Sequence, residues 1–222
     1  MAEHFITVWY SFDRDLWKES LDKYWAHPTV KRNFEVEQYI DRAFEGREYI
    51  LSSGSTLIGF LLESYYPWKF NPMGATRRNQ QALKDDYDHR PSKYDDLCNR
   101  IRRLDISDIE RCLSTVGSGS IPGMKISAGS GFLAVLYPEW YGTVDQHTLG
   151  NIIKIDDDRA EWLRTKATNP SEFFSRDYDL AKHGAKQMIS LYREKADGLN
   201  TAFVTKYWTP RKVEMVTFSL RS

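Results

Sequence analysis

The sequence predicts an all-α fold, and three observations carry this prediction. Apolar residues recur at intervals of three and four along most of the chain, which is the spacing of one helical face. Residues that can cap a helix stand before several of these stretches, and Pro or Gly follows them. Only Phe5–Trp9 and Phe203–Tyr207 have a strand-like composition. We therefore expect a set of short helices.

The helices expected in the N-terminal half are bounded by capping and breaking residues. They run from Asp13 or Asp15 to His27-Pro28, from Val30 to Phe44, from Leu57 to a stop at Pro67, and as two exposed helices within 76–103 that break near Pro91. The segment Asn71–Gly74 is a breaker cluster.

The C-terminal half continues the helical pattern. Ser107 is expected to cap the first of these helices, and Thr209 caps the last, with Pro210 at its first helical position. The expected spans are Asp108–Val116, Ser127–Tyr137, Thr148–Ile155, Arg159–Lys166 after the Asp156–Asp158 cap, Asp179 to about Lys195, and the helix from Pro210.

Composition limits the class of protein. The 222 residues are 41% hydrophobic, which is enough for one large domain or two small ones. Lys+Arg and Asp+Glu are both 31, and this balance argues against a protein that coats nucleic acid non-specifically. Cys98 and Cys112 fit a reduced protein and are too few for a four-cysteine metal site. With no apolar run of the ~20 residues that cross a bilayer and no signal-peptide pattern, we expect a soluble, cytoplasmic monomer without a membrane partner.

The residues most informative about function lie between 117 and 147. Gly117, Gly119 and Gly123 can offer backbone N–H groups to a phosphate, although a plain Gly-Ser linker has the same composition. A helix of small and apolar residues follows, and then Asp145, which is a candidate catalytic carboxylate or simply a helix cap. This order predicts a protein that holds a nucleic-acid backbone and acts on one nucleotide.

Two segments carry a family resemblance. Ile121-Pro-Gly-Met124 and Thr143-Val-Asp-Gln-His147 resemble the Leu-Pro-Gly-Val hairpin and the catalytic Val-Asp-Thr-His segment of helix-hairpin-helix DNA glycosylases. The segments Ala128–Pro138 and Trp208–Met215 look most like an 8-oxoguanine-DNA-glycosylase-like bacterial branch. The resemblance covers residues 108–155 and 207–218. It implies one unit, 1–222, with two helical lobes around a cleft: 1–106 plus the C-terminal helices, and 107–155 carrying the hairpin and the catalytic Asp.

The resemblance also assigns roles to single residues. Ser127 falls where bifunctional members have the lysine that attacks the sugar, so a monofunctional enzyme without lyase activity is expected. A slip of one or two residues would instead place Lys125 there. In the gap-free alignment Lys125 replaces the second hairpin glycine and joins Gly117, Gly119 and Gly123 as a DNA-binding candidate. No cofactor is implied beyond a monovalent cation at the hairpin.

Cleavage of an N-glycosidic bond builds positive charge on the deoxyribose, and a carboxylate such as Asp145 stabilises that charge. The target base must leave the stack to reach it. Trp68, Tyr137, Trp140 and Tyr141 are candidates to stack on or wedge beside the base, with core packing as the alternative for each. His147 is expected to be structural, and we expect no bound metal.

The function expected from the resemblance is a DNA glycosylase that flips out a damaged or modified base and leaves an abasic site. Repair and defence against phage DNA with modified bases both stay open, as does the base itself. A non-catalytic helix-hairpin-helix DNA-binding protein is the first alternative, and a helical protein-interaction domain is the second.

Overall fold

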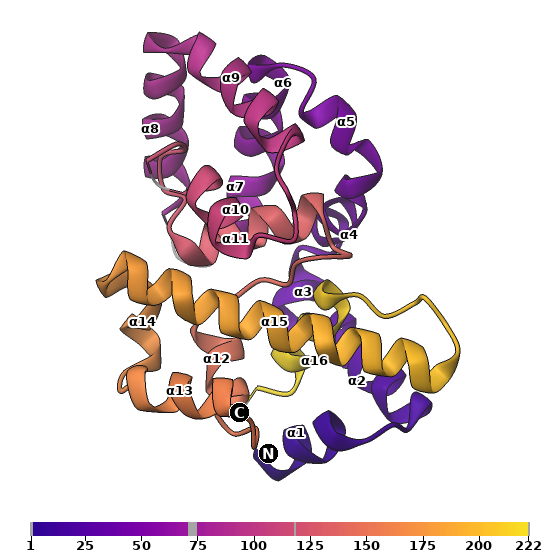
Figure 1. Ribbon diagram of the computed structural model, residues 1–222. Helices are drawn as coiled ribbons and strands as arrows, with labels where there is room; N and C mark the ends of the chain where they lie inside the picture. The colour runs from indigo at the N-terminus through magenta and orange to yellow at the C-terminus, as the bar shows by residue number, and fades with distance from the viewer. Residues whose placement is uncertain (1, 71–74, 118, 222) are drawn as a thin grey trace.

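The computed structural model describes residues 2–70, 75–117 and 119–221 and places them in helices, without a strand among them (Figure 1). The all-α prediction is therefore confirmed for these residues. The Asn71–Gly74 breaker cluster and Ser118 lie outside the described residues.

The described part of the chain begins with ten helical elements that end at His89. They are α1 (Ala2–Tyr10), α2 (Arg14–Ala26), α3 (Pro28–Arg32), α4 (Phe34–Arg42), the 3-10 helix η1 (Ala43–Gly46), α5 (Arg47–Ile50), α6 (Gly54–Phe60), the π-helix η2 (Leu61–Tyr65), α7 (Tyr66–Phe70) and α8 (Thr76–His89). The others are α9 (Pro91–Arg102), α10 (Ile109–Val116), α11 (Ile126–Leu136), α12 (Gln146–Ile152), α13 (Asp158–Lys166), α14 (Pro170–Arg176), α15 (Tyr178–Phe203) and α16 (Pro210–Ser219).

The helices form two groups. Helices α4 to α11 lie together in the upper part of Figure 1, and α1 to α3 join α12 to α16 in the lower part. Within the groups, α6 packs on α9 and α16 packs on α2, while the long α15 contacts α10 and α11 and so connects the two. Helix α10 packs on α9, whereas α12 packs on α14 and α16. The division into lobes 1–106 plus the C-terminal helices and 107–155 stays a prediction.

Side-chain caps fix several helix starts at or near the residues expected from the sequence. Asp13 accepts hydrogen bonds from the N–H groups at the start of α2, and Thr209 accepts one from the Lys212 N–H at the start of α16. The cap of α10 differs from the prediction. Asp108, rather than Ser107, accepts from the Arg111 N–H, because the Ser107 hydroxyl donates to Asp105 instead.

Neither of the two segments with a strand-like composition forms a strand. Phe5, Val8 and Trp9 are buried on one face of α1, at helical spacing, so their bulky side chains stabilise a helix. Phe203 is the last residue of α15 and belongs to no strand. Helix α15 continues past the expected end near Lys195 because the apolar face persists through Ala196, Leu199 and Phe203, all of which are buried.

Two further boundaries differ from prediction. The expected helix 30–44 is divided at Asn33 into α3 and α4. Pro67 does not stop its helix: it is the second residue of α7, and the π-helix η2 leads directly into α7. Pro67 has no N–H to donate to the preceding turn, and the Leu62 carbonyl in η2 accepts a hydrogen bond from the Gln80 side chain at 2.6 Å.

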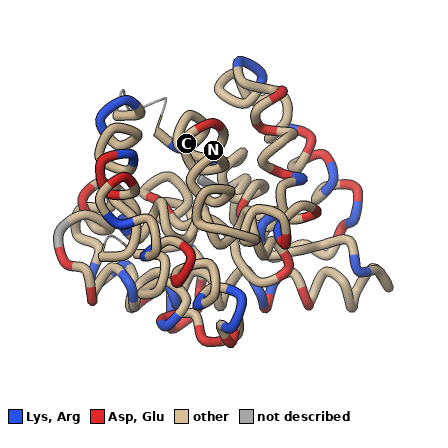
Figure 2. Tube along the Cα trace, turned by 90° about the horizontal axis from the view of Figure 1, so that it is seen from above, with Lys and Arg blue, Asp and Glu red and all other residues tan. Residues whose placement is uncertain are grey.

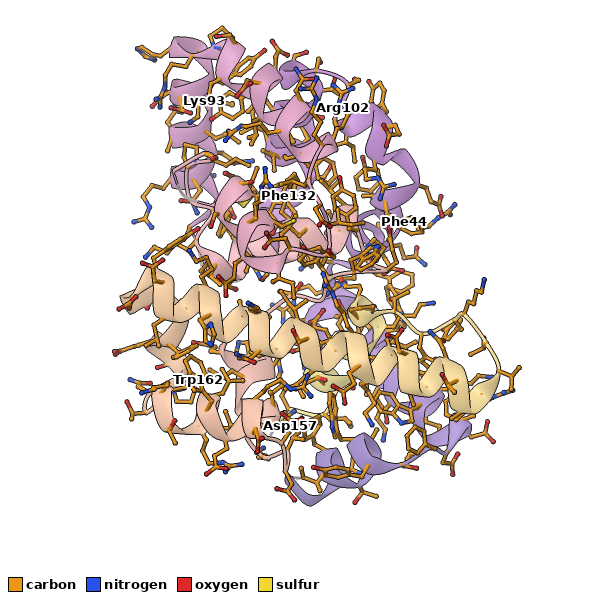
Figure 3. The ribbon with its side chains drawn as sticks, viewed as in Figure 1. Phe44, Lys93, Arg102, Phe132, Asp157 and Trp162 are labelled. Atoms are coloured by element: carbon orange, nitrogen blue, oxygen red, sulfur yellow. The ribbon has the colours of Figure 1, made fainter. Side chains whose placement is uncertain are left out.

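Aromatic side chains pack in the interior of the upper group, and charged residues of both signs are distributed along the chain (Figure 2). Phe132 of α11 is fully buried in the upper group (Figure 3), where its ring contacts Tyr65 edge-on. Figure 2 shows positive and negative residues interspersed along the chain, in agreement with the zero net charge. In the described part of the chain, no helix has the length and apolar character required to cross a membrane.

Candidate functional site

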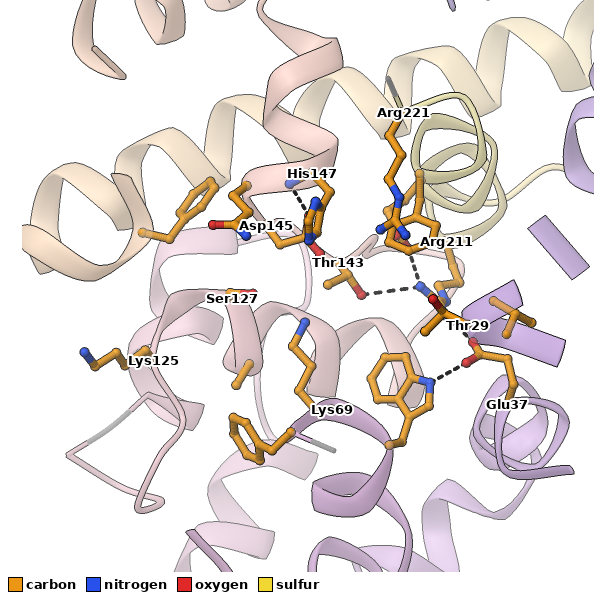
Figure 4. Close-up of a pocket in the computed structure, with 18 of the residues that line it drawn as sticks. Thr29, Glu37, Lys69, Lys125, Ser127, Thr143, Asp145, His147, Arg211 and Arg221 are labelled. Carbon is orange, nitrogen blue, oxygen red and sulfur yellow. Dashed lines mark hydrogen bonds and ion pairs between the residues drawn. The ribbon is translucent and has the colours of Figure 1, made fainter. Parts of the chain in front are cut away.

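A cavity of about 500 Å³ lies where the two groups of helices meet (Figure 4). The upper group contributes lining residues from α4, α7, α11 and the turn before α11. The lower group contributes residues from α2, α3, α12, α14 and α16. Four residues expected to act on or bind DNA line it, namely Gly123, Lys125, Ser127 and Asp145, together with the base-pocket candidate Trp68.

The turn between α10 and α11 holds an unusual backbone conformation at Gly123. Its φ of 79° lies in the left-handed region that favours glycine, and Asn79 of α8 packs against it. Lys125 is the N-cap of α11, but among the described residues no side chain caps this helix. The first N–H groups of α11 are therefore left without the partners that a cap supplies, beside an exposed lysine.

Gly117 and Gly119, the other expected phosphate-binding residues, do not line the cavity. A side chain at Gly117 would collide with the Tyr178 hydroxyl, whereas Gly119 has open space around it. The carbonyls of Gly117, Ile121 and Gly123 accept hydrogen bonds within the turn, and that of Pro122 accepts one from Tyr66. These four carbonyl oxygens therefore already accept hydrogen bonds from the protein. The monovalent cation expected at the hairpin stays a prediction.

Ser127 lies half-buried in the first turn of α11, and hydrogen bonds beside it connect α11 to the segment before Asp145. The Ser130 hydroxyl donates to the Ser127 carbonyl at 3.0 Å and accepts from the Val144 N–H at 3.1 Å. This single side chain therefore fixes where the chain before Asp145 runs relative to Ser127.

Asp145 is the N-cap of α12, and it also faces the cavity. Its Oδ1 accepts hydrogen bonds from the N–H groups of His147 and Thr148 at 2.9 and 3.0 Å, and the Thr148 hydroxyl completes a capping box. Among the described residues nothing donates to its Oδ2. The cap holds the carboxylate rigidly and leaves one oxygen available, so the two roles weighed for Asp145 are compatible.

His147, which is expected to be structural, lies at the wall of the cavity. It lines the cavity beside Asp145, and its ring lies edge-on to Phe218 of α16, with centroids 6.2 Å apart. The capping geometry of Asp145 explains this position, because the first turn of α12 begins at the cavity wall.

The opposite side of the cavity consists of a buried ionic network, which sequence reasoning missed. Arg211 of α16 forms ion pairs with Glu37 of α4 and Glu214 of α16, and all three residues are at most 5% exposed. Glu37 also accepts hydrogen bonds from the Tyr24 hydroxyl and, at 2.6 Å, from the indole N–H of Trp68. We call these five residues the Arg211 network.

Burial and charge shift the ionisation of the network. Burial and the nearby charge of Asp145 raise the pKa of Glu214 to about 7, in spite of the opposing effect of Arg211. For Arg211, burial lowers the pKa, but the surrounding Glu214, Tyr24 and Glu37 outweigh it and hold the pKa above its ordinary value. Arg211 therefore stays charged, while Glu214 gains or loses its proton near neutral pH.

Lys69 is the second functional candidate that the sequence did not indicate. It lies in α7 within the aromatic segment Tyr65–Phe70, and its side chain extends into the cavity (Figure 4). Burial lowers the pKa of its amine, against the raising effects of Asp145 and Glu214. The only signal in the sequence was a lysine in the middle of an aromatic stretch.

Of the four aromatic candidates, only Trp68 reaches the cavity. Tyr137 lies beneath the Arg47 guanidinium, 4.5 Å from its ring centroid, and Arg193 similarly covers Trp140 and Tyr141. The Tyr141 hydroxyl donates to the Ile106 carbonyl at 2.8 Å. These three rings therefore take part in packing the helices.

Within the described ranges no group of three or more His, Cys, Asp or Glu side chains could hold a metal ion. No family model matches the chain, and no curated protein or solved structure matches it. The cavity's own chemistry must therefore support any function: a fixed carboxylate, a nearby amine, a helix N-terminus and a half-buried indole around one space.

Proposed function

We propose that the protein is a DNA glycosylase that flips out a damaged or modified base and cleaves its N-glycosidic bond. The observation that carries this proposal is Asp145, which a helix cap holds rigidly at the cavity wall with its Oδ2 available. Bond cleavage builds positive charge on the sugar, and a carboxylate placed in advance stabilises that charge without reorganising. The resemblance of residues 108–155 to helix-hairpin-helix glycosylases supports the same assignment.

A phosphate has a plausible place beside this carboxylate. The uncapped start of α11 carries a partial positive charge and free N–H groups, and Lys125 extends next to it. Ser130 couples α11 to the segment that ends at Asp145, so a backbone held at α11 would lie in a defined position relative to the carboxylate. A protein with no net charge needs such local contacts to hold DNA.

The cavity also suits an extruded base. Its volume of about 500 Å³ falls within the roughly 300–1,000 Å³ of small-ligand sites. The indole of Trp68 is oriented by Glu37 and lines the cavity, while the Thr143 hydroxyl, held by Arg211, adds a polar group. The volume exceeds what one unmodified base requires, so modified bases belong in the test panel.

The test is release of the free base, detected by mass spectrometry. DNAs with common lesions and DNAs with hypermodified cytosines or thymines are incubated with the wild-type protein and with Asp145→Asn. We expect release from at least one DNA by the wild type and a loss of about 100-fold or more in the variant. Full activity of Asp145→Asn would overturn the role of Asp145.

The same panel tests the non-catalytic alternative, which the zero net charge and Lys125 in place of a hairpin glycine favour. Salt-sensitive DNA binding without release of any base would support a binding protein and overturn the glycosylase. Absence of both binding and release would point to a helical protein-interaction domain.

A further inference from the structure

An amine faces the carboxylate across the cavity. Lys69 extends from α7 toward the region occupied by Ser127, Asp145 and His147 (Figure 4). Among the described residues its Nζ has no hydrogen-bond or ion-pair partner, and its contact with an aromatic ring is to Trp68, 5.8 Å from the centroid. Lys69 is half-buried at the cavity wall, so its amine faces the cavity without a protein group that holds it in place.

The surroundings of Lys69 explain how a lysine can remain there without a partner. Burial disfavours its charged form and lowers the pKa of the amine, which increases the fraction present as the neutral nucleophile. The negative charge on Asp145 acts in the opposite direction. The carboxylates of Glu37 and Glu214, by contrast, are already bound by Arg211.

We propose that Lys69 is a catalytic nucleophile, whose Nζ attacks C1′ of the extruded nucleotide and gives the enzyme lyase activity. This inference rests on the proposed glycosylase function, and it reverses the expectation from Ser127. The sequence position at which bifunctional enzymes carry lysine is occupied here by serine, but the fold brings an amine from α7 to the same cavity.

The neutral amine forms a bond to C1′ while the N-glycosidic bond breaks, and the departing base takes its electron pair and then the proton that the amine loses. The C1′–O4′ bond next opens as the nitrogen lone pair forms a protonated imine, and O4′ acquires a proton from solvent. Loss of a C2′ proton then expels the 3′-phosphate, and water hydrolyses the imine to restore Lys69. No oxidant or reductant takes part.

The test traps the imine. A DNA duplex with one preformed abasic site is incubated with the protein and borohydride, which reduces an imine to a stable amine cross-link. Lys69→Arg keeps the positive charge but not the nucleophile, and Lys69→Met keeps the length of the stem. Lys84→Met, on an exposed face of α8, is the matched control.

We expect a cross-link in the wild type and in Lys84→Met, loss of the cross-link in both Lys69 variants, and a modified peptide that contains Lys69. A cross-link that maps to Lys125 or to the terminal amine, or that persists without Lys69, would overturn the assignment. The binding of both Lys69 variants to abasic DNA shows whether they remain folded and competent.

Base release, measured in parallel, separates the two proposals. Release without cross-linking or strand cleavage would overturn the nucleophile and leave the glycosylase standing. Cross-linking through Lys69 without release of any base would support the amine chemistry and overturn the glycosylase. If neither occurs, both proposals fail.

Discussion

On one side of the cavity the polar groups already have ion-pair or hydrogen-bond partners, and on the other side some of them do not. In the Arg211 network, each charged side chain pairs with an opposite charge, and the Trp68 and Tyr24 donors both point at Glu37. Across the cavity, Asp145 has a free Oδ2 and Lys69 has no ion-pair partner among the described residues. A satisfied network stabilises a shape, whereas unsatisfied groups in a cavity are available for a ligand.

The largest effect on stability is expected in the Arg211 network. Arg211→Met removes the only cation that pairs with Glu37 and Glu214 in the described chain, leaving two buried carboxylates without an opposite charge. We expect the free energy of unfolding to fall by about 3–5 kcal/mol, measured by urea denaturation. Arg42→Met, at an exposed pair with Glu45, is the matched control and should change little. Equal stability of the two variants would show that the network is not structural.

The next prediction separates the two roles of Asp145, as a helix cap and as a catalytic carboxylate. Asn retains an oxygen for the α12 cap, so Asp145→Asn should keep its stability while base release falls by about 100- to 1,000-fold. Asp145→Ala should lose the same activity and, in addition, about 1 kcal/mol of stability. If Asp145→Asn lost stability and kept activity, the residue would be a cap alone.

Glu214 of the Arg211 network should make the free energy of unfolding depend on pH. Since folding raises the pKa of Glu214 from 4.5 to about 7, this group's contribution to stability is complete below pH 4.5 and is lost as the pH rises through 7. Glu214→Gln cannot ionise. The stability of this variant relative to the wild type should therefore improve by up to about 3 kcal/mol between pH 4.5 and 8. Urea denaturation at the two pH values measures this difference, and a pH-independent difference would contradict it.

The fold class and the Asp145 cavity could be predicted, at least in part, because local patterns encode them. Thr209-Pro210 starts a helix whatever packs against it, and the Ile121–His147 segment carries its own turn and cap. Lys69 and Arg211 could not be predicted, because their roles arise only when α7 and α16 meet α4 and α12 in space. The aromatic stretch around Lys69 does not indicate which cavity its side chain enters, and the pairing of Arg211 with Glu37, 174 positions earlier, has no local signature.

The smallest expected effect tests whether the left-handed backbone conformation of Gly123 is required to position the start of α11. Gly123 has a φ of 79°, and a Cβ there would lie 3.1 Å from the Asn79 side chain, so Gly123→Ala should cost about 1–2 kcal/mol. Gly119→Ala meets no neighbour within 4 Å and lacks a positive φ, so its unfolding free energy should stay near that of the wild type. Urea denaturation compares the two. If they were equally stable, the left-handed turn would not be required, and the start of α11 would owe its position to the Ser130 bridge rather than to Gly123.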